Sequence, residues 1–168
     1  TGDDGQVLTS AGAGNPCLFE AAAGGGKVLQ MVSATDSTMR SFSTSGTWGQ
    51  QSSTMNFDIT PAATSSKILL MGSTAGYVGS GQGIQATLFR DSTNLGDSSN
   101  GMVGHYTGTL NSNNGAGLTI IYVDSPSSTS AITYSYQFKG NDTTTKYINC
   151  DGKGLVGVGS LIGLEIGA

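Results

Sequence analysis

Apolar and polar residues alternate along several short segments of this chain, and this period of two constrains the fold more than any other feature. The pattern runs through 54–60 and 84–89, and it is clearest at 132–139, where Ile, Tyr, Tyr and Phe alternate with Thr, Ser, Gln and Lys. Neighbouring side chains of a strand point to opposite faces, so each segment has one buried and one solvated face. No ten-residue window keeps the apolar spacing of a helix. We therefore predict an all-β chain.

Turn-forming residues separate these segments at intervals of about ten residues, which is typical of a sandwich or barrel. We predict an antiparallel β-sandwich of jelly-roll type with about ten strands, preceded by a short extended stalk segment. The predicted strands are 27–35, 39–45, 50–60, 67–78, 84–91, 102–110, 118–124, 131–139, 144–150 and 155–166.

The composition excludes several other classes of protein. Gly, Ser and Thr make up roughly two-fifths of the residues, against an average of about 7% for Gly alone, but the apolar runs 68–71 and 118–123 demand burial and argue against disorder. No Gly-X-Y period is present, so the chain is not collagen-like. The net charge is −4 and the basic residues are scattered, so we expect no nucleic-acid partner. No apolar stretch is long enough for a transmembrane helix, and we expect no membrane insertion.

The first residues differ from the rest. Residues 5–10 form an extended segment, 11–14 turn the chain, and the small residues 21–26 form a hinge. Such a piece cannot bury a core alone. We predict that 1–20 is the end of a stalk, ordered by pairing with other copies of itself, and that 27–168 is the head. Since the chain has neither an initiator Met nor a signal-peptide pattern, we expect it to be part of a longer protein.

Several motifs carry a family resemblance over nearly the whole chain. They are Gly-Gln-Val-Leu-Thr-Ser at 5–10 before Gly-Ala-Gly and Pro, the strand-turn-strand sequence ITPAATSSKIL at 59–69, Tyr-Ser-Tyr-Gln-Phe at 134–138, Tyr-Ile-Asn at 147–149, and Leu-Glu-Ile at 164–166. This set resembles the distal, C-terminal region of bacteriophage tail fibres, which are receptor-binding fibre proteins. The position after Tyr-Ile-Asn, often Arg or Ser in that group, is a cysteine in this chain.

The resemblance implies a homotrimer joined to the remainder of the fibre and virion, made in the cytoplasm of the host bacterium. It also implies a terminal domain that attaches to a bacterial cell-surface glycan or an outer-membrane protein, with a glycan the favoured receptor. Two alternatives stay open: a structural protein that decorates the capsid or forms a head fibre, and a glycan depolymerase. Fibre tips of this kind occur on tails and capsids, so the site of attachment on the particle stays open as well.

The direction of the stalk predicts where a receptor binds. Antiparallel strands reverse the chain, so successive loops alternate between the two ends of a sandwich. The end away from Lys27 then carries the loops 35–38, 61–66, 92–101, 125–130 and 151–154. Their hydroxyl, amide and charged groups suit hydrogen bonds to glycan hydroxyls. The candidate receptor-binding residues are Asn94, Asp97, Ser99, Asn100, Ser127, Asp151 and Lys153, with the aromatic side chains of Trp48 and Tyr77 as alternative contacts or buried anchors.

In the last predicted strand, 155–166, the residues at even positions differ from those at odd positions. Val156, Val158, Ile162, Leu164 and Ile166 share one parity, whereas glycines occupy much of the other. Glycine weakens a strand unless another backbone must come close. We therefore weigh a bend or bulge against close approach of symmetry mates. On the second hypothesis the trimer contacts are Val7, Leu8, Gly157, Gly159 and Gly163.

The residues offer little support for catalysis. His105 is the lone histidine and no nucleophile elbow accompanies it, so we interpret it as a structural or surface histidine and expect no enzyme. A glycosidase pair would have to come from loop aspartates, because Glu20 and Glu165 are the only glutamates. No metal or cofactor motif is present, and we expect neither. Cys17 and Cys150 lie far apart in sequence and are interpreted as free thiols, with a bridge between stalk and head or between chains as the alternative.

Overall fold

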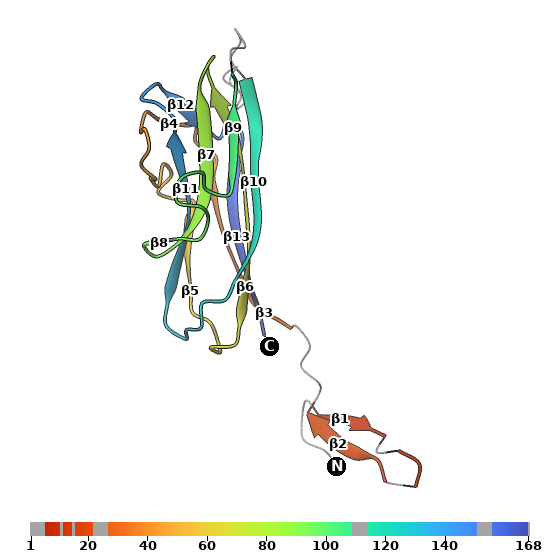
Figure 1. The fold of residues 1–168 in the computed structure, drawn as a ribbon. Coiled ribbons are helices and arrows are strands. Elements are labelled where there is room, and N and C mark those ends of the chain that lie inside the picture. Colours follow the sequence, from red (N-terminus) through yellow and green to blue (C-terminus); the bar gives the residue numbers. More distant parts are fainter. Residues whose placement is uncertain are drawn as a thin grey trace.

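The computed structural model describes residues 6–10, 12–14, 16–21, 27–108, 114–150 and 156–167. All of its regular elements are β-strands (Figure 1). The part of the chain described here contains no helix that is long and apolar enough to cross a membrane. The candidate residues Asp151 and Lys153, and the loop 151–154, fall outside these ranges.

The head consists of two antiparallel sheets packed face to face. The first has the order β3-β13-β6, with β10 paired to one edge of β6 and the short strands β12 and β4 continuing from the other. The second has the order β5-β11-β7, and β7 also pairs with β8 and β9. The bounds are β3 Val28–Asp36, β4 Arg40–Phe42, β5 Asn56–Ile59, β6 Lys67–Val78, β7 Gly83–Arg90, β8 Thr93–Asn94, β9 Val103–Tyr106, β10 Asn114–Asp124, β11 Ile132–Gly140, β12 Lys146–Ile148 and β13 Gly159–Ile166.

This strand order is that of a jelly roll. The long strands β3, β13, β6 and β10 form one four-stranded layer and β5, β11, β7 and β9 form the other, so neighbours within a layer are distant in sequence. The chain passes back and forth between the layers by Greek-key connections. The predicted fold class is confirmed: the molecule is an all-β, antiparallel sandwich.

The core is the space between the layers, and β11 contributes its largest side chains. Tyr134, Tyr136 and Phe138 are fully buried, as the alternation of 132–139 predicts. Their polar atoms are satisfied, because the Tyr136 hydroxyl donates to the Leu118 carbonyl at 3.0 Å and the Tyr134 hydroxyl donates to Asp124 at 2.6 Å. Buried tyrosines of this kind add apolar area without leaving an unpaired hydroxyl.

The ring of Phe57 determines which side of β13 faces the core. Gly159 and Gly163 face the core, where a Cβ at Gly163 would overlap the Phe57 ring and one at Gly159 would overlap Met55 and Asn149. These glycines therefore accommodate the chain's own side chains, and they are not the trimer contacts that the sequence predicts. The opposite parity, which includes Ile162 and Leu164, lies on the outer face of the sheet.

The predicted distribution of loops is wrong for 61–66, 92–101 and 125–130. The chain enters the head beside its C-terminal strand, where the Gly167 amide donates to the Lys27 carbonyl, and the loops 61–66 and 125–130 lie at this same entry end (Figure 1). The cause is the predicted strand 39–45. It is only the three-residue β4, about 10 Å long, and it stays at the far end of the sandwich, where it pairs with β12. Because this strand does not cross the sandwich, the loops 61–66 and 125–130 lie at the opposite end from the one predicted.

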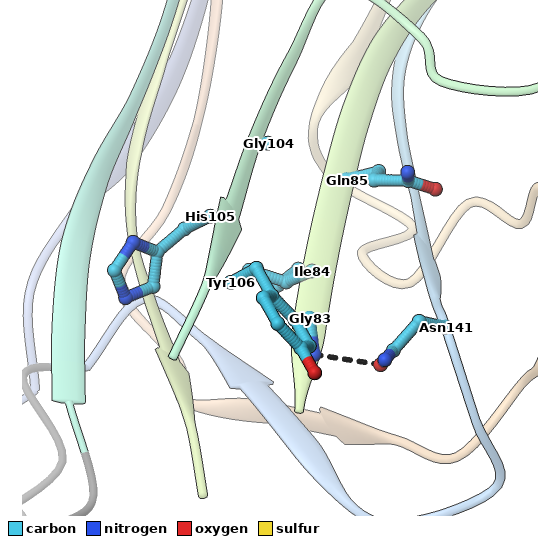
Figure 2. A pocket seen from close by; sticks show the side chains of 7 residues that line it. All are labelled: Gly83, Ile84, Gln85, Gly104, His105, Tyr106 and Asn141. Atoms are coloured by element: carbon cyan, nitrogen blue, oxygen red, sulfur yellow. Dashed lines mark hydrogen bonds between the residues drawn. The ribbon is translucent and has the colours of Figure 1, made fainter. Parts of the chain in front are cut away.

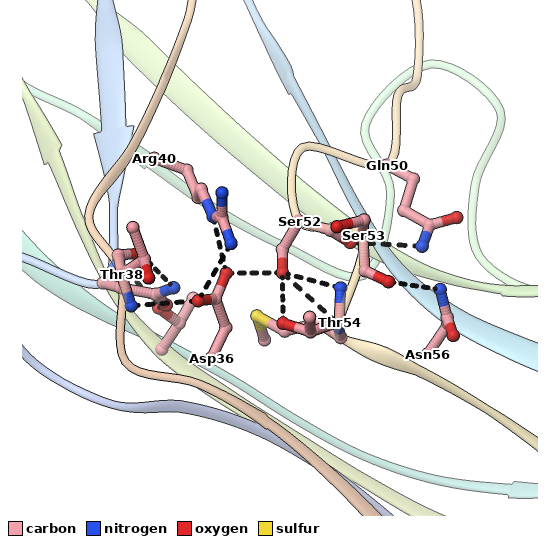
Figure 3. A network of polar contacts seen from close by, with 11 residues as sticks. Asp36, Thr38, Arg40, Gln50, Ser52, Ser53, Thr54 and Asn56 are labelled. Carbon is pink, nitrogen blue, oxygen red and sulfur yellow. Dashed lines mark hydrogen bonds and ion pairs between the residues drawn. The ribbon is translucent and has the colours of Figure 1, made fainter.

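A buried carboxylate holds the far end of β3 to the segment that follows β4 (Figure 3). Asp36 accepts hydrogen bonds from Arg40 Nε at 2.8 Å, from the Thr38 amide at 2.9 Å and from the Ser52 hydroxyl at 2.5 Å. Burial opposes ionisation of Asp36, but these hydrogen bonds outweigh it and lower its pKa to about 2. The network fixes the corner where the chain leaves the first sheet for the second.

The N-terminal segment is a hairpin by itself. β1 (Gln6–Thr9) pairs antiparallel with β2 (Leu18–Ala21), and Leu8 stands opposite Phe19. An extended strand is present at Gln6–Thr9, as predicted, and its partner within the chain is β2. Pairing of this segment with other copies stays a prediction. Leu8, Leu18 and Phe19 are each about half exposed or more, so the hairpin still presents apolar side chains to a partner.

Replacing Gly163 by Ala tests the packing of the two sheets. The new methyl group meets the rigid Phe57 ring, and overpacking of this kind costs about 1–3 kcal/mol. We expect a loss of that size in the free energy of unfolding, measured by urea denaturation. The matched control is Gly117→Ala on β10, where a Cβ meets nothing within 4 Å. Equal stability of the two variants would contradict the packing described.

The Asp36 network predicts a loss of stability in acid. The pKa of Asp36 is lower in the folded state than the value of about 3.9 in an unfolded chain, so its contribution is complete above that value and disappears as the pH falls toward about 2. The contribution is about 2 kcal/mol by linkage. We expect Asp36→Asn to be less stable near neutral pH and to lose less stability below about pH 4 than the parent chain. Parallel slopes of unfolding free energy against pH would refute this.

Candidate functional site

The outer face of the first sheet is apolar across four strands. One row across the sheet consists of Met31, Leu164, Leu69 and Val123, which are register partners. The next row includes Ile162, Met71 and Ile121. Met31 is 66% exposed and Ile121 is 71% exposed. We call the outward side chains of these two rows, together with Leu29 of β3, the assembly face.

A polar row follows the assembly face toward the far end of this sheet. The row beyond the assembly face is made of Thr35, Ser160, Ser73 and Thr119, and the Ser73 and Thr119 hydroxyls are 3.1 Å apart. Lys67, at the entry end of β6, is the charged residue bordering the described rows. A contiguous exposed apolar surface is uncommon on a monomer, so this face is a candidate contact with another molecule.

The opposite side of the head carries a shallow pocket near the far end (Figure 2). It has a volume of about 250 Å³ and is lined by Gly83, Ile84, Gln85, Gly104, His105, Tyr106 and Asn141. Gly83 pairs with Tyr106, and Gln85 pairs with Gly104 on the adjacent strand. Two of these positions lack side chains, so the depression lies between the Tyr106 ring and the Gln85 and Asn141 amides. The Tyr106 side chain is 64% exposed.

The position of Asn141 is fixed by two sets of contacts. Its Oδ1 accepts a hydrogen bond from the Gly83 amide at 2.6 Å. The turn that follows is held by Lys146, whose fully buried ammonium donates to the Asp142 carboxylate and, at 2.9 Å, to the Thr144 carbonyl. Hydrogen bonds from Lys146 and Thr144 lower the pKa of Asp142 to about 2. The amide of Asn141 is therefore preorganised at the rim of the pocket.

The segment 92–101 lies along the side of the second sheet rather than at its far end. Its Leu95 amide donates to the Leu88 carbonyl at 2.9 Å. Asn94 and Asp97 hold the segment together: Asn94 Oδ1 accepts from Thr87 Oγ1 at 2.7 Å, and Asp97 Oδ1 accepts from the amides of Ser99 and Asn100. The Ser99 and Asn100 side chains are exposed and donate or accept no hydrogen bond within the described residues.

Trp48 anchors this segment. Its indole Nε1 donates to the Ser98 carbonyl at 3.0 Å, and the Lys139 ammonium lies 4.4 Å from its ring centroid. Lys139 also donates to the Ser99 carbonyl. Lys139 is the register partner of Gln85, so Trp48 and the 92–101 segment share one outer face with the pocket. The structure thus brings Trp48 together with Asn94, Asp97, Ser99 and Asn100, a grouping that the sequence does not indicate.

The other predicted contacts are dispersed. Ser127 lies in the entry-end loop, and Tyr77 packs against Tyr147 with ring centroids 5.9 Å apart on the first sheet. Tyr106 and Asn141 are not among the residues that the sequence predicts as contacts. Tyr106 follows Gly104-His105 and is therefore an aromatic residue beside a glycine, the same signal that makes Trp48 and Tyr77 candidates.

His105 points to the other side of β9 from Tyr106 (Figure 2), and its buried Nε2 has no hydrogen-bond partner among the described residues. Within those residues no group of His, Cys, Asp or Glu side chains has the arrangement of a metal site. Cys17 is exposed in the hairpin and Cys150 is buried, and neither takes part in a disulfide in this single chain. The absence of an enzymatic activity stays a prediction.

No protein-family model and no curated protein matches the sequence. Several solved structures of infectious bursal disease virus are similar. A chain of the T13 particle of that virus is 14% identical with a TM-score of 0.40, over 95% of this chain and 42% of that one. A chain of the Gx strain is 9% identical with a TM-score of 0.38, over 96% and 44%. This chain spans less than half the length of those proteins, and its jelly-roll assignment rests on its own strand order.

Proposed function

We propose that this chain is the self-assembling head of a bacteriophage fibre, a homotrimer that attaches the particle to a glycan on the bacterial surface. The observation that carries the proposal is the assembly face. It leaves Met31, Ile121 and Val123 more than half exposed in the single chain. Burying apolar surface contributes about 25 cal/mol per Å², so a face of this kind favours association over exposure.

Assembly through this face has a direct consequence for attachment. The assembly face belongs to the first sheet, so contact between copies leaves the outer side of the second sheet exposed on every subunit. Three equivalent binding surfaces then point outward from one head. Modest affinity at each surface is sufficient, because linked sites raise the overall avidity by about 10²–10⁴. The threefold symmetry itself is proposed from the resemblance to tail fibres.

A second candidate is a structural role in a capsid, as a decoration protein or head fibre. The jelly-roll strand order favours it, since this fold recurs in viral capsid proteins. The two roles differ in what purified protein does to infection. A receptor-binding head competes with particles for adsorption to host cells, whereas a decoration protein leaves adsorption unchanged. Labelled antibodies against the chain, imaged on intact particles, give its place on the virion.

Placing a charge on the assembly face is expected to separate the subunits. Ile162 is central in the face and points outward, so Ile162→Lys leaves the core intact and buries an unpaired ammonium in any contact between copies. We expect a trimer for the parent chain and a monomer for the variant in sedimentation-velocity experiments. Thr133→Lys, at an exposed position on the second sheet, is the matched control and stays trimeric. A monomeric parent chain would overturn the proposal.

The 92–101 segment allows a receptor role to be separated from a structural one. Asp97→Ala removes hydrogen bonds that hold the segment, whereas Ser99→Ala and Asn100→Ala remove only exposed polar groups. If these groups contact the receptor, the double variant Ser99→Ala, Asn100→Ala lowers adsorption of whole particles at least several-fold and leaves the melting temperature unchanged. Normal adsorption of that variant excludes the two side chains from the contact surface.

A further inference from the structure

We infer that the pocket formed by Tyr106, Gln85, Asn141, Gly83 and Gly104 binds one neutral pyranose ring of a surface glycan. The inference rests on the proposed attachment function and identifies the residues and the class of sugar involved.

The Tyr106 ring supplies an apolar platform. It is 64% exposed at the end of β9, beside two positions that have no side chains, Gly83 and Gly104. One face of a pyranose ring presents aliphatic C–H groups, which pack against an aromatic ring and remove apolar surface from water. A larger residue at Gly104 would occupy the same space, because a Cβ there lies 3.3 Å from Gln85 Cγ and from the Ile84 carbonyl.

Amide groups at the rim match the polar edge of such a ring. Asn141 accepts from the Gly83 amide through Oδ1, and its Nδ2 has no partner in the part of the chain that the structure describes. The same holds for the Gln85 amide and the Tyr106 hydroxyl. These groups together offer donors and acceptors to sugar hydroxyls. Since Asn141 is already held by Gly83, little side-chain entropy is lost when its remaining donor engages a ligand.

The charge of the lining selects the class of sugar. The lining residues include no Lys, Arg, Asp or Glu. Lys139, the register partner of Gln85 on this face, is 5% exposed and already engaged with Trp48 and the Ser99 carbonyl, and Lys146, beside Asn141, is fully buried and bound to Asp142 and Thr144. An acidic sugar would therefore find no cation to pair with. A volume of about 250 Å³ accommodates a single ring, so the glycan is held at one residue while the rest of it extends over the surface.

The position of the pocket agrees with the proposed assembly. It lies on the second sheet, on the opposite layer from the assembly face, and toward the end away from Lys27. A homotrimer formed through the first sheet leaves each pocket open to solvent. The pocket also shares its outer face with Trp48 and the 92–101 segment, which could border a longer glycan.

The test titrates the complete chain with methyl glucoside, methyl galactoside and N-acetylglucosamine, and follows backbone amide shifts by NMR. We expect shifts confined to the pocket residues with at least one of these sugars, with a dissociation constant on the order of 1 mM, which is about −4 kcal/mol. Glucuronic acid is the charged comparison and binds more weakly. Tyr106→Ala weakens binding at least about tenfold, Gly104→Val abolishes it, and Tyr106→Phe keeps most of it because the ring remains.

Thr133→Ala, at the other end of the same outer face, is the matched control and binds as the parent chain does. Absence of shifts with all three neutral sugars, or equal affinity for Tyr106→Ala and the parent chain, overturns the inference. The Ile162→Lys variant keeps the two proposals distinct. A monomeric variant that still binds sugar supports the pocket independently of assembly, whereas a trimer without sugar binding refutes the pocket and leaves assembly standing.

Discussion

The packing of large rings from one sheet against glycines of the other is the contact on which the rest of the structure depends. Packed sheets lie about 10 Å apart, so a ring that projects from one layer needs a gap in the other. Phe57 lies against Gly163, and Tyr136 lies beside Gly72, where a Cβ would come within 3.1 Å of its ring. The inward positions of β13 are taken by Gly159, Leu161, Gly163 and Glu165, so the other aliphatic side chains of this strand are directed outward.

This arrangement makes the head two-sided. One outer face carries the exposed apolar rows of four strands, and we propose that it joins copies of the chain. The other is polar, with an exposed tyrosine and amides around a depression that two glycines create. Buried charges secure the parts that must stay in place: Asp36 at the corner after β3, Lys146 at the turn beside Asn141, and Glu165, which accepts from the Ala62 amide at 2.7 Å and ties the 61–66 loop to β13. The proposed ligand surface therefore belongs to a rigid scaffold.

The alternating segments were predictable because, in a half-buried strand, every second residue is buried and apolar, and this alternation is visible in the sequence. Met55, Phe57, Ile84, Leu88 and Tyr134 are all buried as the alternation indicates. The loop positions were not predictable in the same way. The sequence around β4 resembles that of a full strand, but β4 is too short to cross the sandwich and stays at the far end. The pocket was missed for a related reason. Its residues come from β7, β9 and the turn at Asn141, and no local pattern shows that these three segments meet.

The alternation and turn signals alone are sufficient to establish an all-β sandwich, since the period of two and the spacing of turns are local properties of the backbone. They also identify the extended N-terminal segment. The partner of each strand depends on contacts between residues far apart in sequence, and so does the side on which the glycines of β13 lie. Both faces of β13 carry residues suited to burial. The Phe57 ring on the facing sheet leaves room only for the face that carries Gly163, so that face is the buried one. As a result, Ile162 and Leu164, which the sequence alone would also allow in the core, lie on the outer face of the sheet.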